Sequence, residues 1–226
     1  MDGIQTNQYV DETTNNTMLK VFFRMFLGLL ATGLTALYTY QSGLYLTILS
    51  GASYAVIAVI ELIVVLVFSF LFKKLSPLAV TILFYLYAFI NGITLSVIFA
   101  AFEMNTIFYA FFTTAALFGG LALYGYTTNR DITRWGSILT VALIVGLVVS
   151  VVNLFIGNSL IDIALDWIIL LVFCGLTIYD INKIKLMGQE LEQDSEKLYI
   201  YGAMELYLDF INIFIRILSI MGRRRD

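Results

Sequence analysis

Two aspartates near the C-terminus, Asp180 and Asp209, are the residues whose type and setting most clearly suggest chemistry. Each lies in or at the end of an apolar segment long enough to cross a membrane, where an ionised carboxylate is costly. If the two carboxyl groups come within hydrogen-bond reach, repulsion and desolvation oppose ionisation of both, so the pair holds one shared proton. Such a pair would sense pH. Because calcium prefers oxygen ligands, the same two residues are also candidate calcium ligands.

The second of these aspartates belongs to a polar stripe within residues 198–221. Tyr201, Glu205, Asp209, Asn212 and Arg216 are spaced 4, 4, 3 and 4 residues apart, which places them on one face of a helix. Ionisable groups are costly in hydrocarbon, so this helix is expected to be enclosed by protein rather than by lipid. Glu205 and Asn212 could line a cation route, with Glu205 at its aqueous mouth, and Arg216 could serve as a local counter-charge.

Composition identifies the elements that must position these residues. Of the 226 residues, 60% are hydrophobic and 13% are charged, a balance typical of a polytopic membrane protein. The formal net charge of −3 and the lack of long basic tracts do not indicate nucleic-acid binding, and nothing indicates a cofactor. A single cysteine and the absence of histidine exclude an intrachain disulfide, a cysteine–histidine catalytic pair and zinc sites that use histidine.

A span needs about 20 residues, so the chain has room for seven transmembrane helices and no separate soluble domain. The apolar pattern predicts an all-α protein, with spans at about 19–40, 44–72, 78–100, 106–126, 136–156, 161–182 and 198–221. Residues 1–18 are expected to form a flexible cytoplasmic tail, residues 19–221 a single membrane domain, and residues 222–226 a basic tail.

Basic residues favour a cytoplasmic N-terminus, since retained loops carry the excess of lysine and arginine. With this orientation, nine basic residues lie on the cytoplasmic side and the intervening outer loops hold none: Lys20, Arg24, Lys73, Lys74, Arg130, Arg134, Lys183, Lys185 and Lys197. A seventh full crossing would place Arg223 to Arg225 outside, against the rule. Either the last helix crosses, which we favour, or it is re-entrant.

Two short matches suggest an internal repeat. Residues 33–40 resemble residues 120–126, and residues 91–94 resemble residues 174–177. The matched spans run in opposite directions, so a true repeat would be inverted, as in many transporters. Chance matches are equally compatible with segments this short and apolar.

Simpler readings of the acidic residues stay open. Asp180 could be an interfacial residue paired with Lys183 or Lys185, and Asp209 could pair with Arg216 or a tyrosine. The two aspartates meet only if the sixth span continues past residue 182 towards residue 187, or if the last helix enters the membrane late. Glu61 is also intramembrane, with functional and structural roles equally compatible.

Other acids lie near the outer ends of spans. Glu103, Asp162 and Asp166 are expected to be solvated, although an acidic outer vestibule would attract cations.

The chain resembles the Bax inhibitor-1 (transmembrane Bax inhibitor motif) family. The resemblance rests on YLDFINIF at 207–214, the Tyr179-Asp180 pair, FINGITLS at 89–96, and GYTT at 125–128 before Asp131. It implies a bacterial member with seven helices, the C-terminal helix central and surrounded by two three-helix layers, and a pH-dependent calcium leak. The family's di-aspartyl pH sensor would fall on Asp180 and Asp209, and its second-span glutamate on Glu61.

One departure from the family concerns the end of the second span. Bacterial relatives carry an arginine there that is thought to latch onto the sensor, whereas Lys73 occupies this region here. A lysine cannot make the bidentate fork of arginine, so Lys73 is only a candidate gating residue.

The leading functional prediction is therefore a calcium or cation leak channel gated by the proton shared between Asp180 and Asp209. A proton-coupled carrier for a small solute is the alternative, and a structural or partner-binding protein is also open. An intramembrane aspartyl protease is less favoured, because residues 207–208 do not match the Gly-x-Gly motif expected before Asp209; no enzyme is predicted. Expected partners are membrane lipid, calcium ions and protons, with protein partners unknown. The expected location is a bacterial plasma membrane.

Overall fold

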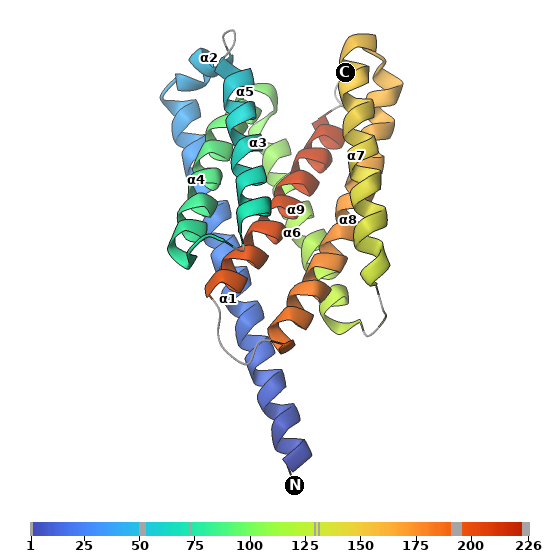
Figure 1. Cartoon of the computed structure of the whole chain (residues 1–226). Helices are drawn as coiled ribbons and strands as arrows, with labels where there is room; N and C mark the ends of the chain where they lie inside the picture. The colour runs from blue at the N-terminus through green and yellow to red at the C-terminus, as the bar shows by residue number, and fades with distance from the viewer. Residues whose placement is uncertain are drawn as a thin grey trace. The chain divides into compact units, whose positions relative to one another are not determined.

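The computed structural model describes residues 2–49, 53–72, 74–128, 130, 132–190 and 196–222. Its secondary structure in this part of the chain is helical, with no strand, which confirms the all-α prediction (Figure 1). The helices of the described residues are α1 (Asp2–Gln41), α2 (Leu44–Leu49), α3 (Ser53–Leu71), α4 (Pro77–Leu95), α5 (Ile98–Ala101), α6 (Met104–Thr127), α7 (Thr133–Ile156), α8 (Ser159–Glu190) and α9 (Glu196–Gly222).

Five stretches within the described residues are long and apolar enough to cross a membrane. They are Asn15–Gln41, Pro77–Ala101, Met104–Thr127, Thr133–Ile156 and Ser159–Gln189. These spans support an integral membrane protein. Helices α3 and α9 occupy the positions of the other two predicted spans, and the total of seven crossings stays a prediction.

One predicted span is divided into a long and a short helix. Residues 78–100 form α4 and α5, whereas the described parts of the span predicted at 44–72 form α2 and α3. The division between α4 and α5 falls at Ser96, whose backbone N–H donates to the Ile93 carbonyl at 3.2 Å and whose hydroxyl donates to the same oxygen at 2.6 Å. Hydropathy cannot detect such a break, because the residues on both sides of it are apolar.

Helices α1 and α8 extend beyond their apolar segments. The first begins at Asp2 and so includes the residues predicted to form a flexible tail, whose mobility and side of the membrane stay predictions. The eighth continues to Glu190 rather than ending near residue 182. This extension meets the condition under which Asp180 could reach Asp209.

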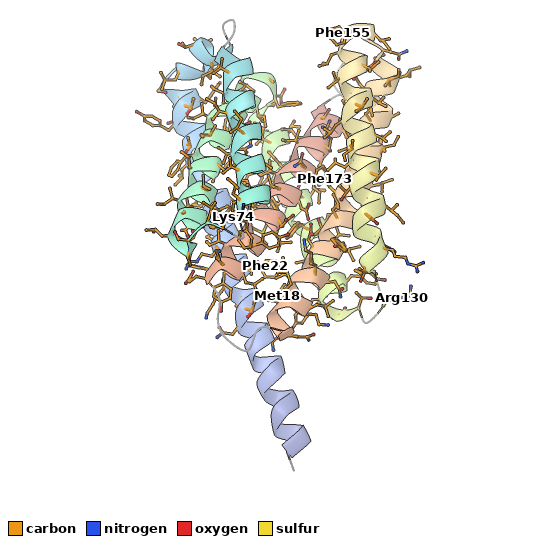
Figure 2. The ribbon with its side chains drawn as sticks, in the orientation of Figure 1. Met18, Phe22, Lys74, Arg130, Phe155 and Phe173 are labelled. Atoms are coloured by element: carbon orange, nitrogen blue, oxygen red, sulfur yellow. The ribbon has the colours of Figure 1, made fainter. Side chains whose placement is uncertain are left out.

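Local sequence signals explain two of the helix ends. The Ser76 hydroxyl accepts a hydrogen bond from the backbone N–H of Ala79 at 3.2 Å, and Pro77 follows at the first helical position of α4. At the end of α7, Gly157 adopts a left-handed conformation with φ of 67°. Figure 2 shows Phe155 near this end of α7 and Arg130 beyond its opposite end.

The chain divides into two compact units. Unit 1 comprises Met1–Met104 and Met187–Tyr207, and unit 2 comprises Asn105–Leu186 and Leu208–Asp226. Among the described residues, unit 1 contains the long helices α1, α3 and α4 with the first half of α9. Unit 2 contains α6, α7 and most of α8 with the second half of α9. This division matches the halves of the suspected repeat, whose common origin stays a prediction.

Within each unit a glycine allows two helices to approach closely. A Cβ atom on Gly92 of α4 would lie 2.6 Å from the Thr32 carbonyl oxygen of α1 in unit 1. A Cβ atom on Gly125 of α6 would lie 2.7 Å from the Ile178 carbonyl oxygen of α8 in unit 2. Small residues at such contacts let helix backbones pack directly against each other in membranes.

Replacement of Gly92 by alanine should therefore destabilise the protein. The new methyl group meets backbone rather than a movable side chain, so we expect a loss of about 1–3 kcal/mol, as for other overpacked cores. Thermal unfolding in detergent measures the effect. Gly33→Ala is the matched control, because a Cβ there has nothing within 4 Å. Equal unfolding temperatures for the two variants would contradict the proposed close approach.

Candidate functional site

Helix α9 carries the predicted polar stripe and is the most enclosed helix of the described chain. From Lys197 to Gly222 none of its residues is exposed. Asp209 is buried, and the other four members of the stripe are half-buried, namely Tyr201, Glu205, Asn212 and Arg216. An enclosed helix that keeps a polar stripe agrees with the expectation that α9 faces protein or water rather than lipid.

The two aspartates of the predicted sensor both lie in unit 2. Asp180 on α8 is 6% exposed, and Asp209 on α9 is 3% exposed. The interfacial reading of Asp180 predicted a solvated helix end, whereas this residue is buried and ten residues before the end of α8. Lys185, one of its suggested partners, instead donates to the Tyr126 carbonyl oxygen at 2.8 Å.

Two contacts, both made by Asp166 on α8, indicate the register of α8 against α9. The first is the ion pair with Arg216 on α9 at 2.9 Å. In the second, the Asp166 Oδ2 atom accepts a hydrogen bond from the Ser219 hydroxyl on α9 at 2.6 Å. Only residues 191–195 separate the two helices, so they run in opposite directions, as in a helical hairpin. Asp180 lies 14 residues, or about 21 Å, along α8 from Asp166, and Asp209 lies 10 residues, or about 15 Å, back along α9 from Ser219.

For straight antiparallel helices the Ser219 contact puts Asp180 and Asp209 about 6 Å apart in level and the Arg216 contact about 10 Å, which is one to two helical turns. The positions around the two helix axes are also compatible with a contact between Asp180 and Asp209. A separation of 14 residues on α8 leaves Asp166 and Asp180 about 40° apart around the helix, and seven residues on α9 leave Asp209 and Arg216 about 20° apart. For ideal helices, both aspartates would therefore be turned towards the α8–α9 contact. Direct contact between their carboxyl groups stays a prediction.

Arg216 has a different partner from the one that the stripe suggested. Its Nη1 atom donates to Asp166 Oδ1 at 2.9 Å, forming an ion pair between α9 and α8. Asp166 was expected to be solvated at the outer end of a span, but it is 3% exposed. The spacing within α9 could not reveal this partner, because it lies on another helix. The sequence offered only the four-residue spacing of Asp162 and Asp166, which puts both acids on one face of α8 but does not point to Arg216.

The other two predicted site residues of α9, Asn212 and Glu205, make no side-chain hydrogen bond to another helix within the described part of the chain. The Asn212 side chain donates to the Leu208 carbonyl oxygen of its own helix at 2.8 Å. Glu205 is half-buried and belongs to unit 1. Lys73, the candidate replacement for the latch arginine, and Arg223 to Arg225 lie outside the described residues.

Unit 1 contains a second intramembrane polar cluster. The Thr94 hydroxyl donates to Glu61 Oε1 at 2.9 Å, which links α4 to α3. Nearby on α4, the Asn91 Oδ1 atom accepts from the Tyr207 hydroxyl at 3.2 Å, and this hydroxyl also lies 2.7 Å from the Thr32 hydroxyl of α1. The functional and structural readings of Glu61 thus both remain, since hydrogen bonding satisfies an intramembrane acid in either role. Sequence patterns did not single out Thr32.

The described residues provide no group of three or more cysteine, histidine, aspartate or glutamate side chains arranged to hold a metal ion. Calcium usually takes six to eight oxygen ligands. Two aspartates alone supply fewer oxygen ligands than calcium usually takes.

Comparison with known proteins finds similar sequences over most of the chain. The sequence model of the family described as inhibitor of apoptosis-promoting Bax1 matches residues 14–226. The inner membrane protein YbhL of Escherichia coli K12 is 39% identical over 214 residues, which cover 92% of each chain. A protein of Rickettsia prowazekii is 36% identical over 223 residues, covering 97% of this chain and 94% of its own. A Borreliella burgdorferi protein is 34% identical over 217 residues, covering 94% of each.

These matches extend over nearly the whole chain, and the range matched by the family model spans the positions of α8 and α9. Together with the apolar helices, they identify an integral membrane protein. The chain belongs to the Bax inhibitor-1 family.

Proposed function

We propose that this protein forms a passive, pH-sensitive pathway for cations across the membrane, with calcium as the favoured ion. The observation that carries the proposal is the burial of both Asp180 and Asp209 within one unit, on two helices that contact each other through Asp166. A shared proton joins the two carboxyl groups at low pH and holds α8 against α9. Loss of that proton at higher pH breaks the bond and frees carboxylate oxygens for a hard cation.

The proposed route follows the polar stripe of α9. Three members of this stripe are half-buried: Glu205, Asn212 and Arg216. Their polar groups are therefore accessible to a passing ion, as those of a fully buried helix would not be. Glu61 is a further candidate on the route, and Lys73 a candidate gating residue. The chain is proposed to need no cofactor and to act as a channel rather than an enzyme. Lipid, calcium and protons are its proposed partners.

The orientation proposed for the chain has a cytoplasmic N-terminus in a bacterial plasma membrane. In unit 1, Arg24 forms an ion pair with Glu196 at 2.9 Å, and the Lys20 ammonium group lies 4.8 Å from the centre of the Tyr199 ring. In unit 2, Lys185 caps the end of α6 through the Tyr126 carbonyl oxygen. In unit 1 the basic groups thus lie beside the first turn of α9, and in unit 2 a basic group lies at the end of α6. The positive-inside rule expects basic residues of this kind on a cytoplasmic face.

Calcium flux into liposomes containing the purified protein tests the proposal. We expect flux above that of empty liposomes, low at acidic pH and higher at alkaline pH, because the shared proton closes the pathway. Flux that is absent at every pH, or that falls as the pH rises, would contradict it.

A proton-coupled solute carrier is the second candidate. The division into two units with three long helices each favours it, since inverted repeats are common in such carriers. Solute-dependent proton movement in the same vesicles would distinguish a carrier from a leak.

A further inference from the structure

The ion pair between Asp166 and Arg216 lies well away from the proposed sensor. Asp166 is in the second turn of α8, about 21 Å along the helix from Asp180. Its two carboxylate oxygens are divided between Arg216 at 2.9 Å and Ser219 at 2.6 Å, both on α9. Three side chains from two helices thus hold one another in a defined geometry.

The two charges of this pair differ in their access to the surroundings. The side chain of Asp166 is 4% exposed, whereas that of Arg216 is 26% exposed. The negative charge of Asp166 is therefore buried, and the accessible charge of the pair is the positive guanidinium of Arg216. The Nε atom of Arg216 is itself buried and has no hydrogen-bond partner among the described residues.

A purely stabilising role explains this arrangement poorly. A buried ion pair costs desolvation energy that its attraction often only repays, and apolar replacements of such pairs are frequently as stable. The pair also lies on the polar stripe of α9, along which cations are proposed to pass. A positive charge on that stripe opposes the entry of cations.

We propose that Arg216, positioned by Asp166 and Ser219, is an electrostatic barrier that limits the flow of cations along the α8–α9 side of the pathway. The inference rests on the proposed cation leak and adds a rate-limiting residue to it. At an effective dielectric constant of about 20, an unpaired positive charge would slow a nearby divalent cation by far more than tenfold. The Asp166 carboxylate at 2.9 Å offsets most of this repulsion, so the expected slowing is roughly tenfold. The leak is thereby kept small even when the aspartate pair is open.

The two members of the pair should affect flux in opposite directions, and measurements in liposomes at alkaline pH test this. Arg216→Gln removes the barrier, so calcium flux should rise by roughly tenfold. Asp166→Asn leaves the guanidinium without its counter-charge, so calcium flux should fall and chloride flux should appear. Arg216→Lys keeps the charge and should keep calcium flux low. Arg134→Gln, which removes an exposed charge on α7, is the control and should leave flux unchanged.

Each alternative gives a different result. Equal increases in calcium flux from Arg216→Gln and Asp166→Asn would mean that the pair is a mechanical lock, and would overturn the barrier. Unchanged flux in both would overturn it as well. If either single variant fails to fold, the charge-balanced double variant D166N/R216Q carries the test and should show the raised flux. A failure of the proposed cation leak would give a different result, because the wild-type protein itself would then show no calcium flux at any pH.

Discussion

Calcium flux through the Asp209→Asn variant is expected to be independent of pH. Asparagine can neither hold nor release the shared proton, so the contact with Asp180 no longer changes between acidic and alkaline conditions. The ratio of alkaline to acidic flux should fall to about one, since the coupled titration of the pair is lost. Flux into liposomes across a pH series, normalised to the amount of reconstituted protein, measures this ratio.

The control for this experiment is Glu103→Gln. Glu103 is an exposed acid between α5 and α6, so its replacement removes one carboxylate without changing the sensor. The control should keep the wild-type pH response. A full pH response in Asp209→Asn would remove Asp209 from the sensor.

Replacement of Asp180 is expected to reproduce the effect of replacing Asp209. A proton shared by two carboxyl groups belongs to both, so either single change should abolish the pH response and the double change should add nothing further. Sites that act as one unit show this non-additivity in a double-mutant cycle. The measurement is the alkaline-to-acidic flux ratio of Asp180→Asn, Asp209→Asn and the double variant.

Independent effects of the two changes would contradict the shared proton. If Asp180→Asn kept its pH response while Asp209→Asn lost it, the titrating proton would reside on Asp209 alone. Asp162→Asn provides a matched comparison on α8, because Asp162 is an exposed acid four residues before Asp166. It should leave the flux ratio at the wild-type value.

Sequence patterns predicted the long helices well because membrane spans are defined by hydropathy and length. Sequence patterns did not predict the helix ends correctly where a helix continues past the end of its apolar segment. The end of α8 was predicted near residue 182, where polar residues begin, but the helix continues to Glu190 because polar residues also form helices. The break that separates α4 from α5 was missed for the opposite reason, since a backbone turn within apolar sequence leaves hydropathy unchanged.

The candidate site was predictable where it depends on one helix and less so where it depends on two. The spacing within residues 198–221 correctly predicted an enclosed helix with a polar stripe, and Asp180 and Asp209 are both buried in one unit. The partner of Arg216 required the packing of α8 against α9, which brings Asp166 to it. The hydrogen bonds of Tyr207 likewise depend on α1 and α4, which are remote in sequence.

The distance between the carboxyl groups of Asp180 and Asp209, measured in experimental structures at acidic and alkaline pH, tests the central claim most directly. A shared proton predicts carboxyl oxygens within about 3 Å of each other at acidic pH and a longer separation at alkaline pH. Carboxyl groups well beyond that distance at acidic pH, with no water bridging them, would contradict the shared proton and the gating built on it.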